Sequence, residues 1–322
     1  MSIIRRSIIL IGLLFIGFGL SAQQDKKNTQ YMFSKLAYNP GAAGSGGGIC
    51  INGIVRQQWA GFQDPEGNNV GPETFFLTVG SPVRVLHGAV GGTIMQDKLA
   101  FWTDISVNLG YTYIADIGGG NLGIGFQAAF INRSLDYSKF LFIDENDPVK
   151  LEGEQSDMLF DMNIGAYYEV PDNFYLGASS FNILQSSGKE LGSGEGNATE
   201  NKYETHRSIF LLGGYNYILP SNPLVEIKPS MLVQFSPGTY TFDLSSILEY
   251  NNKFWGGLNY RYQESLGVIV GVNFRNFSIG YSYDINTMNL NIGGSTHEIR
   301  LGYCFKIEFD KAMKIYRNTR FL

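Results

Sequence analysis

Chemically reactive side chains are scarce in this chain of 322 residues, which contains only three histidines and two cysteines (His87, His206, His297, Cys50 and Cys304). No histidine lies in a known catalytic motif, and the sequence has no G-x-S-x-G, H-E-x-x-H or P-loop pattern. The two cysteines are too few for a disulfide framework and lack the spacing of a zinc site. His297 and Glu298 are adjacent on an expected strand, so their side chains point to opposite faces and cannot form a metal pair with each other. The sequence therefore predicts a protein without enzymatic activity, metal or cofactor.

Long apolar runs are missing after residue 22, where none approaches the ~20 residues that a membrane helix requires. Residues 1–22 combine a basic Arg5–Arg6 pair, an apolar stretch from Ile8 to Leu20 and small residues before Gln23. This pattern is typical of a secretory signal peptide, and a membrane anchor is the alternative interpretation. The net charge of −5 gives no general argument for nucleic-acid binding.

Proline is scarce at 10 residues, whereas glycine is abundant at 40 and aromatic residues make up 14% of the chain. Between residues 254 and 305, apolar side chains alternate with small or polar ones; Val268, Val270 and Val272 share one face of a strand and Gly271 lies on the other. A soluble sandwich also alternates, but these segments have the length of about ten residues that is usual for a membrane-crossing strand. We therefore expect an all-β protein, a transmembrane antiparallel β-barrel of the outer membrane, with its apolar face toward lipid. On this interpretation Val270→Arg costs about 2–4 kcal/mol near the membrane midplane, and Gly271→Ser is far milder.

Fourteen segments are expected to be strands, so that the barrel spans residues 49–305. They are residues 49–59, 73–81, 87–97, 101–116, 121–132, 159–169, 174–183, 207–219, 224–235, 239–250, 254–263, 266–275, 277–285 and 295–305. Short turns and longer polar loops alternate between them, as periplasmic turns and outer loops do in such barrels. An even number of strands places both termini on the periplasmic side.

Four segments outside the strands have interpretations of their own. Residues 23–48 are either an ordered N-terminal arm or a plug in the lumen or periplasmic mouth. Residues 306–322 form a periplasmic C-terminal tail with five basic residues, which is either a frayed terminus or a docking segment. Residues 133–158 read as a solvated acidic loop, with calcium binding as the alternative, although the spacing of a calcium loop is missing. Residues 184–206 are rich in Ser, Gly and Glu and are expected to be a mobile outer loop.

The two cysteines are expected to lie close together if the barrel closes between its first and last strands. Cys50 is at the start of the first strand and Cys304 at the end of the last, and these ends meet in an antiparallel pair. The compartment beyond the inner membrane permits a disulfide, whereas barrel shear can offset the pair by a few residues. A bonded pair and a merely close pair therefore both remain open.

The stretch from Arg56 to Thr74 is a candidate recognition surface beside the lumen. It contains Trp59 and Phe62 at the end of the first strand, and Pro72 shapes the loop that follows. The alternative is that the aromatic residues only anchor the barrel at the membrane interface and the prolines only shape a turn.

This stretch is one of a series of segments that together resemble the PorP/SprF family of the type IX secretion system, an export machine of the Bacteroidota. Each segment is weak alone, but their order is specific, and they cover nearly the whole chain after the signal peptide. Gly41 stands where the family's N-P-A pattern has Ala, which is a mild departure. The matching segments are Gln30–Met32, Tyr38–Gly44, Gln57–Trp59, Gly61–Phe62, Pro72–Thr74, Gly91–Asp97, Val225–Gln234, Trp255–Gly257, Tyr260–Arg261, Tyr281–Asp284 and Ser295–Tyr303.

The resemblance implies an outer-membrane barrel that works with periplasmic and peptidoglycan-linked components of the secretion system. It also implies support for the secretion or surface attachment of a large adhesin-type cargo, including adhesins of gliding motility, recognised directly or by its C-terminal signal. The candidate residues for partner or cargo recognition are Asn39, Pro40, Arg56, Trp59, Phe62, Pro72, Thr74, Arg261, His297 and Glu298.

Two transport functions remain as alternatives. A channel of the FadL type for apolar solutes also carries an Asn-Pro segment in an N-terminal plug, which Asn39–Pro40 fits. A porin would instead have an open lumen and a measurable conductance.

Overall fold

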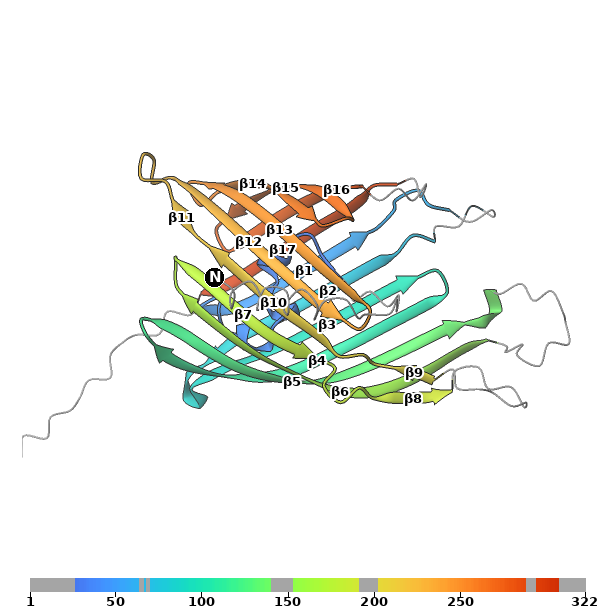
Figure 1. Cartoon of the computed structure of the whole chain (residues 1–322). Coiled ribbons are helices and arrows are strands. Elements are labelled where there is room, and N and C mark those ends of the chain that lie inside the picture. The colour runs from blue at the N-terminus through green and yellow to red at the C-terminus, as the bar shows by residue number, and fades with distance from the viewer. Residues whose placement is uncertain are drawn as a thin grey trace, which may run out of the picture.

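A computed structural model of the chain describes residues 27–63, 67, 70–139, 153–190, 202–287 and 294–306. Within these residues, fourteen antiparallel strands close into a barrel (Figure 1), which confirms the fold class that the alternation predicts. β10 and β11 are two parts of one strand that is interrupted at Asn216 and pairs with β12 on both sides of the break. The barrel strands are β1 (Gly48–Gln57), β2 (Glu73–Val83), β3 (Gly88–Leu99), β4 (Trp102–Ile117), β5 (Gly120–Asp136), β6 (Glu154–Val170), β7 (Phe174–Phe181), β10 (Ser208–Tyr215), β11 (Tyr217–Ile218), β12 (Val225–Ser236), β13 (Thr239–Tyr250), β14 (Phe254–Arg261), β15 (Ser265–Phe274), β16 (Phe277–Asn286) and β17 (Thr296–Lys306).

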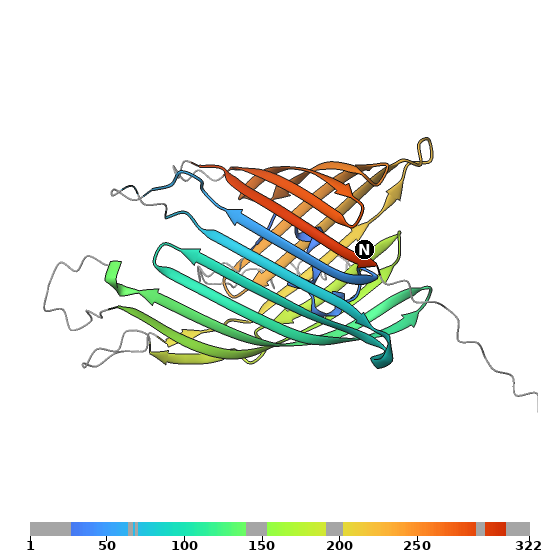
Figure 2. The ribbon, with the colours of Figure 1, turned by 180° about the vertical axis from the view of Figure 1, so that it is seen from behind.

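The barrel closes between its first and last strands. The register of β1 and β17 pairs Gly48 with Lys306 at one end and Gln57 with His297 at the other. On the opposite side of the barrel, β10 pairs with both β7 and β12. Figure 2 shows the closing pair from behind, with β1 in blue beside β17 in red.

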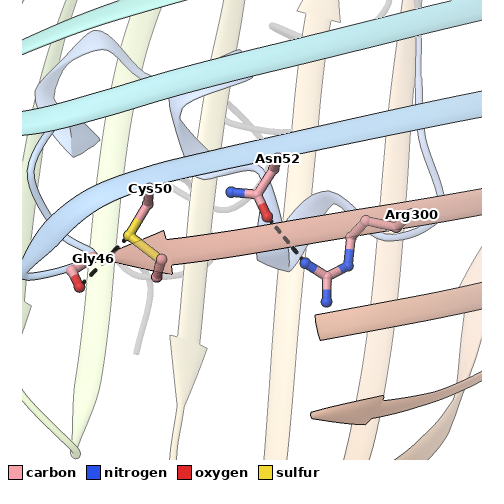
Figure 3. The surroundings of a disulfide bond; sticks show 5 residues. Gly46, Cys50, Asn52 and Arg300 are labelled. Atoms are coloured by element: carbon pink, nitrogen blue, oxygen red, sulfur yellow. Dashed lines mark hydrogen bonds between the residues drawn. A yellow bond between two sulfur atoms is a disulfide. The ribbon is translucent and has the colours of Figure 1, made fainter. Parts of the chain in front are cut away.

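A disulfide bond joins Cys50 and Cys304 across this closing pair. The two residues are directly opposite each other in the register, and their Cα atoms are 4.1 Å apart. Figure 3 shows the bond with Asn52 and Arg300, which lie further along the same two strands. The sequence predicts the proximity but leaves the bond open, because only the register reveals that this pair has no offset.

Side chains alternate between an apolar outer surface and a polar inner surface. On β15, the outward Val270 is 50% exposed, whereas the inward Ile269 is fully buried. On β16 and β17, Asp284 and Glu298 point inward and are buried, while Ile299 points outward and is exposed. The predicted register is therefore correct for these strands. An apolar exterior around a polar interior is the reverse of a soluble protein and suits a lipid environment.

Residues 27–47 run through the lumen as a plug, and Figure 1 shows them as the blue segment inside the barrel. Of the two arrangements left open for residues 23–48, the described part lies in the lumen. Tyr31 and Tyr38 of the plug pack with Phe210 and Leu212 of the barrel wall, so the plug and the wall share one apolar core. The short 3₁₀ helices are η1 (Tyr31–Phe33), η2 (Lys35–Ala37) and η3 (Pro40–Ala42) in the plug, with η4 (Arg84–Leu86) and η5 (Tyr137–Lys139) between strands. In the described part of the chain, no helix is long and apolar enough to cross a membrane.

Two regions differ from the sequence expectation. β5 and β6 extend several residues beyond the expected ends at 132 and 159, because polar pairs such as Asp136 and Glu154 continue the ladder without an apolar signal. Within residues 184–206, expected to be a mobile loop, β8 (Ser187–Glu190) and β9 (Lys202–Glu204) pair as a hairpin. The expected signal peptide, residues 140–152 of the acidic loop and all of the expected tail except Lys306 lie outside the described residues.

Candidate functional site

The plug crosses the lumen between two ends of the barrel that differ in their connections. We call the end where β1 ends and β17 begins the loop end, and the end where β1 begins and β17 ends the terminal end. Lys27 lies near the loop end, where its Nζ is 3.3 Å from Glu264 in the connection between β14 and β15. The plug reaches the terminal end at Gly47, directly before β1. Its contacts with the wall therefore extend from one end of the lumen to the other.

The first turn of the plug is bound by a buried group that we call the Arg56 network: Thr29, Gln30, Arg56, Asp284 and Glu298. The Glu298 carboxylate accepts hydrogen bonds from the backbone N–H groups of Thr29 at 2.8 Å and Gln30 at 2.9 Å. Arg56 forms ion pairs with Asp284 at 2.9 Å and Glu298 at 3.1 Å, and donates to the Thr29 hydroxyl at 2.8 Å. The Thr29 hydroxyl in turn donates to Asp284 at 2.5 Å. Three strands thus converge on two plug residues.

A second buried group, the Arg261 network, binds the start of the plug: Lys27, Asn28, Asp243, Arg261 and Glu264. Arg261 forms ion pairs with Asp243 at 2.7 Å and Glu264 at 3.1 Å, and donates to the Asn28 carbonyl at 3.4 Å. Burial alone would raise the pKa of Glu264, but the cations Arg261 and Lys27 outweigh it and lower that pKa to about 2. Burial also lowers the pKa of Lys27.

The two networks bury three cations and four carboxylates: Lys27, Arg56, Arg261, Asp243, Glu264, Asp284 and Glu298. Breaking a buried ion pair by removing one partner costs about 3–5 kcal/mol, because the other charge stays buried without compensation. The buried networks therefore hold the first turn of the plug more strongly than an exposed ion pair would, since an exposed pair contributes only about 0–1 kcal/mol.

Aromatic side chains bind the middle of the plug. The Phe33 ring lies 4.7 Å from the Trp255 ring and 4.1 Å from the Arg300 guanidinium, between β14 and β17. The Lys35 ammonium donates to the Tyr167 hydroxyl at 3.0 Å and lies 3.8 Å from the Tyr175 ring. Burial lowers the pKa of Lys35 to about 8. The plug thus places a cation among aromatic rings, an arrangement that is attractive in a desolvated site.

Asn39 and Pro40 fix the last part of the plug against β4, β6 and β7. The Asn39 side chain accepts from the Gly41 backbone N–H at 2.8 Å and donates to the carbonyls of Ala166 at 2.9 Å and Ala178 at 3.3 Å. The Pro40 carbonyl accepts from the Thr112 hydroxyl at 2.7 Å. Both residues are buried, so their contacts in this structure are with the protein itself.

The remaining candidate residues lie at the loop end. Trp59 packs against Phe62 with ring centroids 6.3 Å apart, and the Gln58 N–H donates to the Pro72 carbonyl at 2.8 Å. His297 points outward, with its Nδ1 2.7 Å from the Tyr281 hydroxyl. Thr74, two residues after Pro72, is opposite Arg56 in the pairing of β1 with β2, and its hydroxyl donates to Asp97 at 2.5 Å.

The candidates therefore do not form one surface. Arg56 and Glu298 meet in one network and Arg261 belongs to the neighbouring one, while Asn39 and Pro40 lie deeper in the lumen. Thr29, Asp243, Glu264 and Asp284 were missed by the sequence reasoning. The alternation of β13 and β16 puts Asp243 and Asp284 on the lumen face, and this signal could have found them.

Two cavities lie on either side of the plug. The loop-end cavity has a volume of about 430 Å³ and is lined mainly by the loop-end halves of β3, β4 and β5. In it, Arg133 pairs with Asp104 and lies 3.6 Å from the Tyr203 ring of the β8–β9 hairpin. The second cavity has a volume of about 610 Å³ and lies at the terminal end, between the plug and β1, β2, β12, β13 and β15–β17. We call it the mouth pocket.

A family model described as "Type IX secretion system membrane protein PorP/SprF" matches residues 20–303. The chain belongs to the PorP/SprF family. This confirms the resemblance seen in its sequence segments. Together with the closed barrel and its apolar exterior, it identifies an outer-membrane barrel of type IX secretion.

Several solved outer-membrane proteins are similar to this PorP/SprF chain at low sequence identity. The Ralstonia pickettii toluene transporter TbuX is 12% identical with a TM-score of 0.49, over 86% of this chain and 94% of TbuX. The Pseudomonas putida toluene transporter TodX is 11% identical with a TM-score of 0.47, over 90% of this chain and 96% of TodX. The Acinetobacter baumannii outer membrane protein Omp33 is 8% identical with a TM-score of 0.45, over 80% and 98% of the two chains. No curated protein is significantly similar to the chain in sequence.

Proposed function

We propose that this PorP/SprF barrel is a non-enzymatic docking component that supports the secretion or surface attachment of one cognate, large adhesin-type cargo. The observation that carries the proposal is the plug, which residues 27–47 form and two buried ionic networks hold in place. A lumen occupied by the protein's own chain argues against an open porin and suits a protein that recognises partners at its two ends. A FadL-type channel also carries a plug, so the deletion strain described below is needed to discriminate it.

The terminal end faces the periplasm in this proposal, and periplasmic, peptidoglycan-linked components of the system bind there. The loop end then faces the outside and recognises the cargo or its C-terminal signal. Trp59, Phe62, Pro72 and His297 lie at the loop end and are at least partly accessible, whereas Arg56, Arg261 and Glu298 are buried in the networks. Cargo recognition is therefore assigned to the first group, with the buried group positioning the plug.

A complementation experiment tests this function. A strain that lacks the gene receives either the natural protein or the Trp59→Ala/Phe62→Ala variant, and the adhesin on the cell surface is measured. Tyr240→Ala is the matched control, because Tyr240 is an exposed aromatic residue near the loop end, at the start of β13. We expect the double variant to reduce surface adhesin while the control and the amount of barrel in the membrane stay unchanged.

The deletion strain also discriminates the alternatives. Normal adhesin secretion combined with lost uptake of an apolar solute would replace this proposal with a FadL-like transporter. A large conductance of the purified natural protein in planar bilayers would favour a porin instead. A pull-down from solubilised outer membrane identifies the bound partners, and truncation at Ile307 is expected to reduce the recovery of periplasmic ones.

A further inference from the structure

The mouth pocket contains a buried cation that no carboxylate in the described residues pairs with. Arg300 is only 2% exposed and lines this pocket on β17. Its Nη atoms donate to the Asn52 side chain at 3.0 Å and to the Ser278 hydroxyl, and its guanidinium lies over the Phe33 ring. All three neighbours are neutral. Figure 3 shows Arg300 and Asn52 beside the disulfide.

The nearest carboxylate on the same face of β17 is already engaged elsewhere. Glu298 precedes Arg300 by two residues and is bound to Arg56 and to the backbone of Thr29 and Gln30. Glu298 therefore acts on Arg300 only from a distance, without a direct ion pair. An arginine has five N–H donors, of which Arg300 uses two. A buried charge without a directly paired opposite charge is unfavourable, so the site favours an added anion.

Two unpartnered polar atoms also indicate that the mouth pocket favours an anion. Among the residues that the structure describes, Arg300 Nε and the Ser34 hydroxyl are buried and have no hydrogen-bond partner. Both residues line the mouth pocket, and Ser34 is 2% exposed. A carboxylate can accept hydrogen bonds from an arginine and a hydroxyl at once, through two oxygens with about four acceptor positions.

The charge and shape of the pocket favour a peptide over a small free anion. The charged side chains that line it are Lys35, Lys228, Arg275, Arg300 and Glu249. Lys228 forms ion pairs with Glu249 and Glu226, which leaves Lys35, Arg275 and Arg300 as the lining cations without an ion pair in the described residues. Asn252 and Asn276 place exposed amides in the turns at the rim, and the wall along Gly44, Gly46 and Gly48 has no bulky side chains. Amides and bare backbone can hydrogen-bond an extended chain, as in other peptide sites.

We propose that the mouth pocket binds an extended, acidic peptide segment of a periplasmic partner, with a carboxylate of that segment held by Arg300 and Ser34. The identity of the partner rests on the proposed function, in which the terminal end faces the periplasm. The prediction that the pocket binds an acidic segment does not rest on the proposed function, because it depends only on the contacts of Arg300 and the charge of the lining.

A binding experiment with the full-length, detergent-solubilised barrel tests the proposal. The probe is a dye-labelled hexapeptide of alternating Glu and Gly, and the same peptide with Gln in place of Glu is its uncharged control. We expect the Gln peptide to bind about tenfold more weakly, and Arg300→Gln to weaken binding of the Glu peptide about tenfold. Arg207→Gln removes the same charge at the loop end, where Arg207 is exposed, and leaves binding unchanged.

Equal binding of the two peptides, or unchanged binding by Arg300→Gln, would overturn the proposal. Competition by inorganic phosphate or acetate as effective as competition by unlabelled peptide would overturn it too, in favour of a small-anion site. If Arg300→Gln does not fold, Arg275→Gln at the exposed rim replaces it, with an expected loss of about threefold. If the protein binds the peptide but does not support cargo secretion, the proposed function is refuted and the peptide-binding proposal stands. If secretion is normal but the protein does not bind the peptide, the peptide-binding proposal is refuted and the proposed function stands.

Discussion

Glycines on the lumen face make room for the aromatic side chain that holds the plug. The Trp255 indole lies across Gly271 of β15 and Gly280 of β16 and packs against Phe33. A Cβ atom at Gly271 would overlap the Trp255 ring and come within 2.5 Å of the Ile279 carbonyl oxygen. These contacts argue against the expectation that Gly271→Ser is far milder than Val270→Arg. Alternation reveals that a position faces the lumen, but not which side chain from another strand covers it.

Two glycine substitutions on the lumen face test this explanation. Gly271→Ala is expected to destabilise the barrel by about 1–3 kcal/mol, because neither the indole nor the carbonyl can withdraw freely. Gly80→Ala is the matched control, since a Cβ there meets its nearest atom at 3.6 Å. The urea midpoint of unfolding, followed by Trp fluorescence, measures both. Similar midpoints for the two variants would show that Trp255 does not constrain Gly271.

Glu264 predicts a dependence of stability on acidic pH. Its pKa in the folded protein is about 2, below the ordinary value of 4.5, so its contribution is present above pH 4.5 and is lost as the pH falls through 2. The shift corresponds to about 2–3 kcal/mol after allowance for partial exposure of the side chain. Glu264→Gln should therefore unfold at a lower temperature than the natural protein at pH 7. The difference should disappear at pH 2, and a constant difference would contradict the assignment.

At the scale of the element, the position of an outward-facing residue along its strand determines its depth in the membrane. Val270 lies in the middle of β15 and Phe274 at its end, and both point outward. Val270→Arg is expected to cost about 2–4 kcal/mol, whereas Phe274→Arg costs about 0–1 kcal/mol because it lies near the interface. The amount of heat-modifiable, folded barrel in the membrane measures the effect. Equal defects from the two arginines would mean that β15 is not placed across the membrane as described.

The plug is an element whose attachment depends on a few buried charges. Glu298→Ala removes the acceptor of two plug N–H groups and one partner of Arg56, which costs about 3–5 kcal/mol of local stability. We expect faster trypsin cleavage after Lys27 and Lys35 and a higher conductance in planar bilayers. Glu73→Ala, at an exposed loop-end position, is the control and should change neither. Unchanged cleavage in Glu298→Ala would place the attachment of the plug elsewhere.

At the scale of the whole molecule, the closing pair of strands is also the site of the disulfide. Cys50 and Cys304 are 254 residues apart in sequence, so the bond encloses almost the whole barrel. A disulfide typically stabilises a protein by about 2–4 kcal/mol, chiefly by restricting its unfolded chain. Reductant should therefore lower the temperature at which the natural barrel loses its folded band in a gel. The Cys50→Ser/Cys304→Ser variant should start at that lower temperature and not respond to reductant, and a reductant-insensitive natural barrel would exclude this role.

The strands, their faces and the closing pair could be predicted because their signals are local. A period of two follows from the geometry of each strand, so Val270 and Ile269 are assigned to opposite faces without knowledge of their neighbours. Fourteen such segments, with turns between them, then require the first strand to meet the last. The ends of β5 and β6 are not predicted, because polar pairs such as Asp136 and Glu154 extend the ladder without an apolar signal.

The contacts inside the lumen could not be predicted, because they join residues that only closure, strand tilt and register bring together. Arg56 meets Asp284 across 228 positions, and Thr29 meets Glu298 across 269. Alternation places Arg56, Asp284 and Glu298 on the inner face of the barrel. It does not show which of the many inward-facing residues contact the plug. The tertiary structure decides which of these positions the plug reaches. Arg56 and Glu298, predicted as recognition residues, instead hold the plug in the lumen, and Arg300 is a buried charge in the mouth pocket.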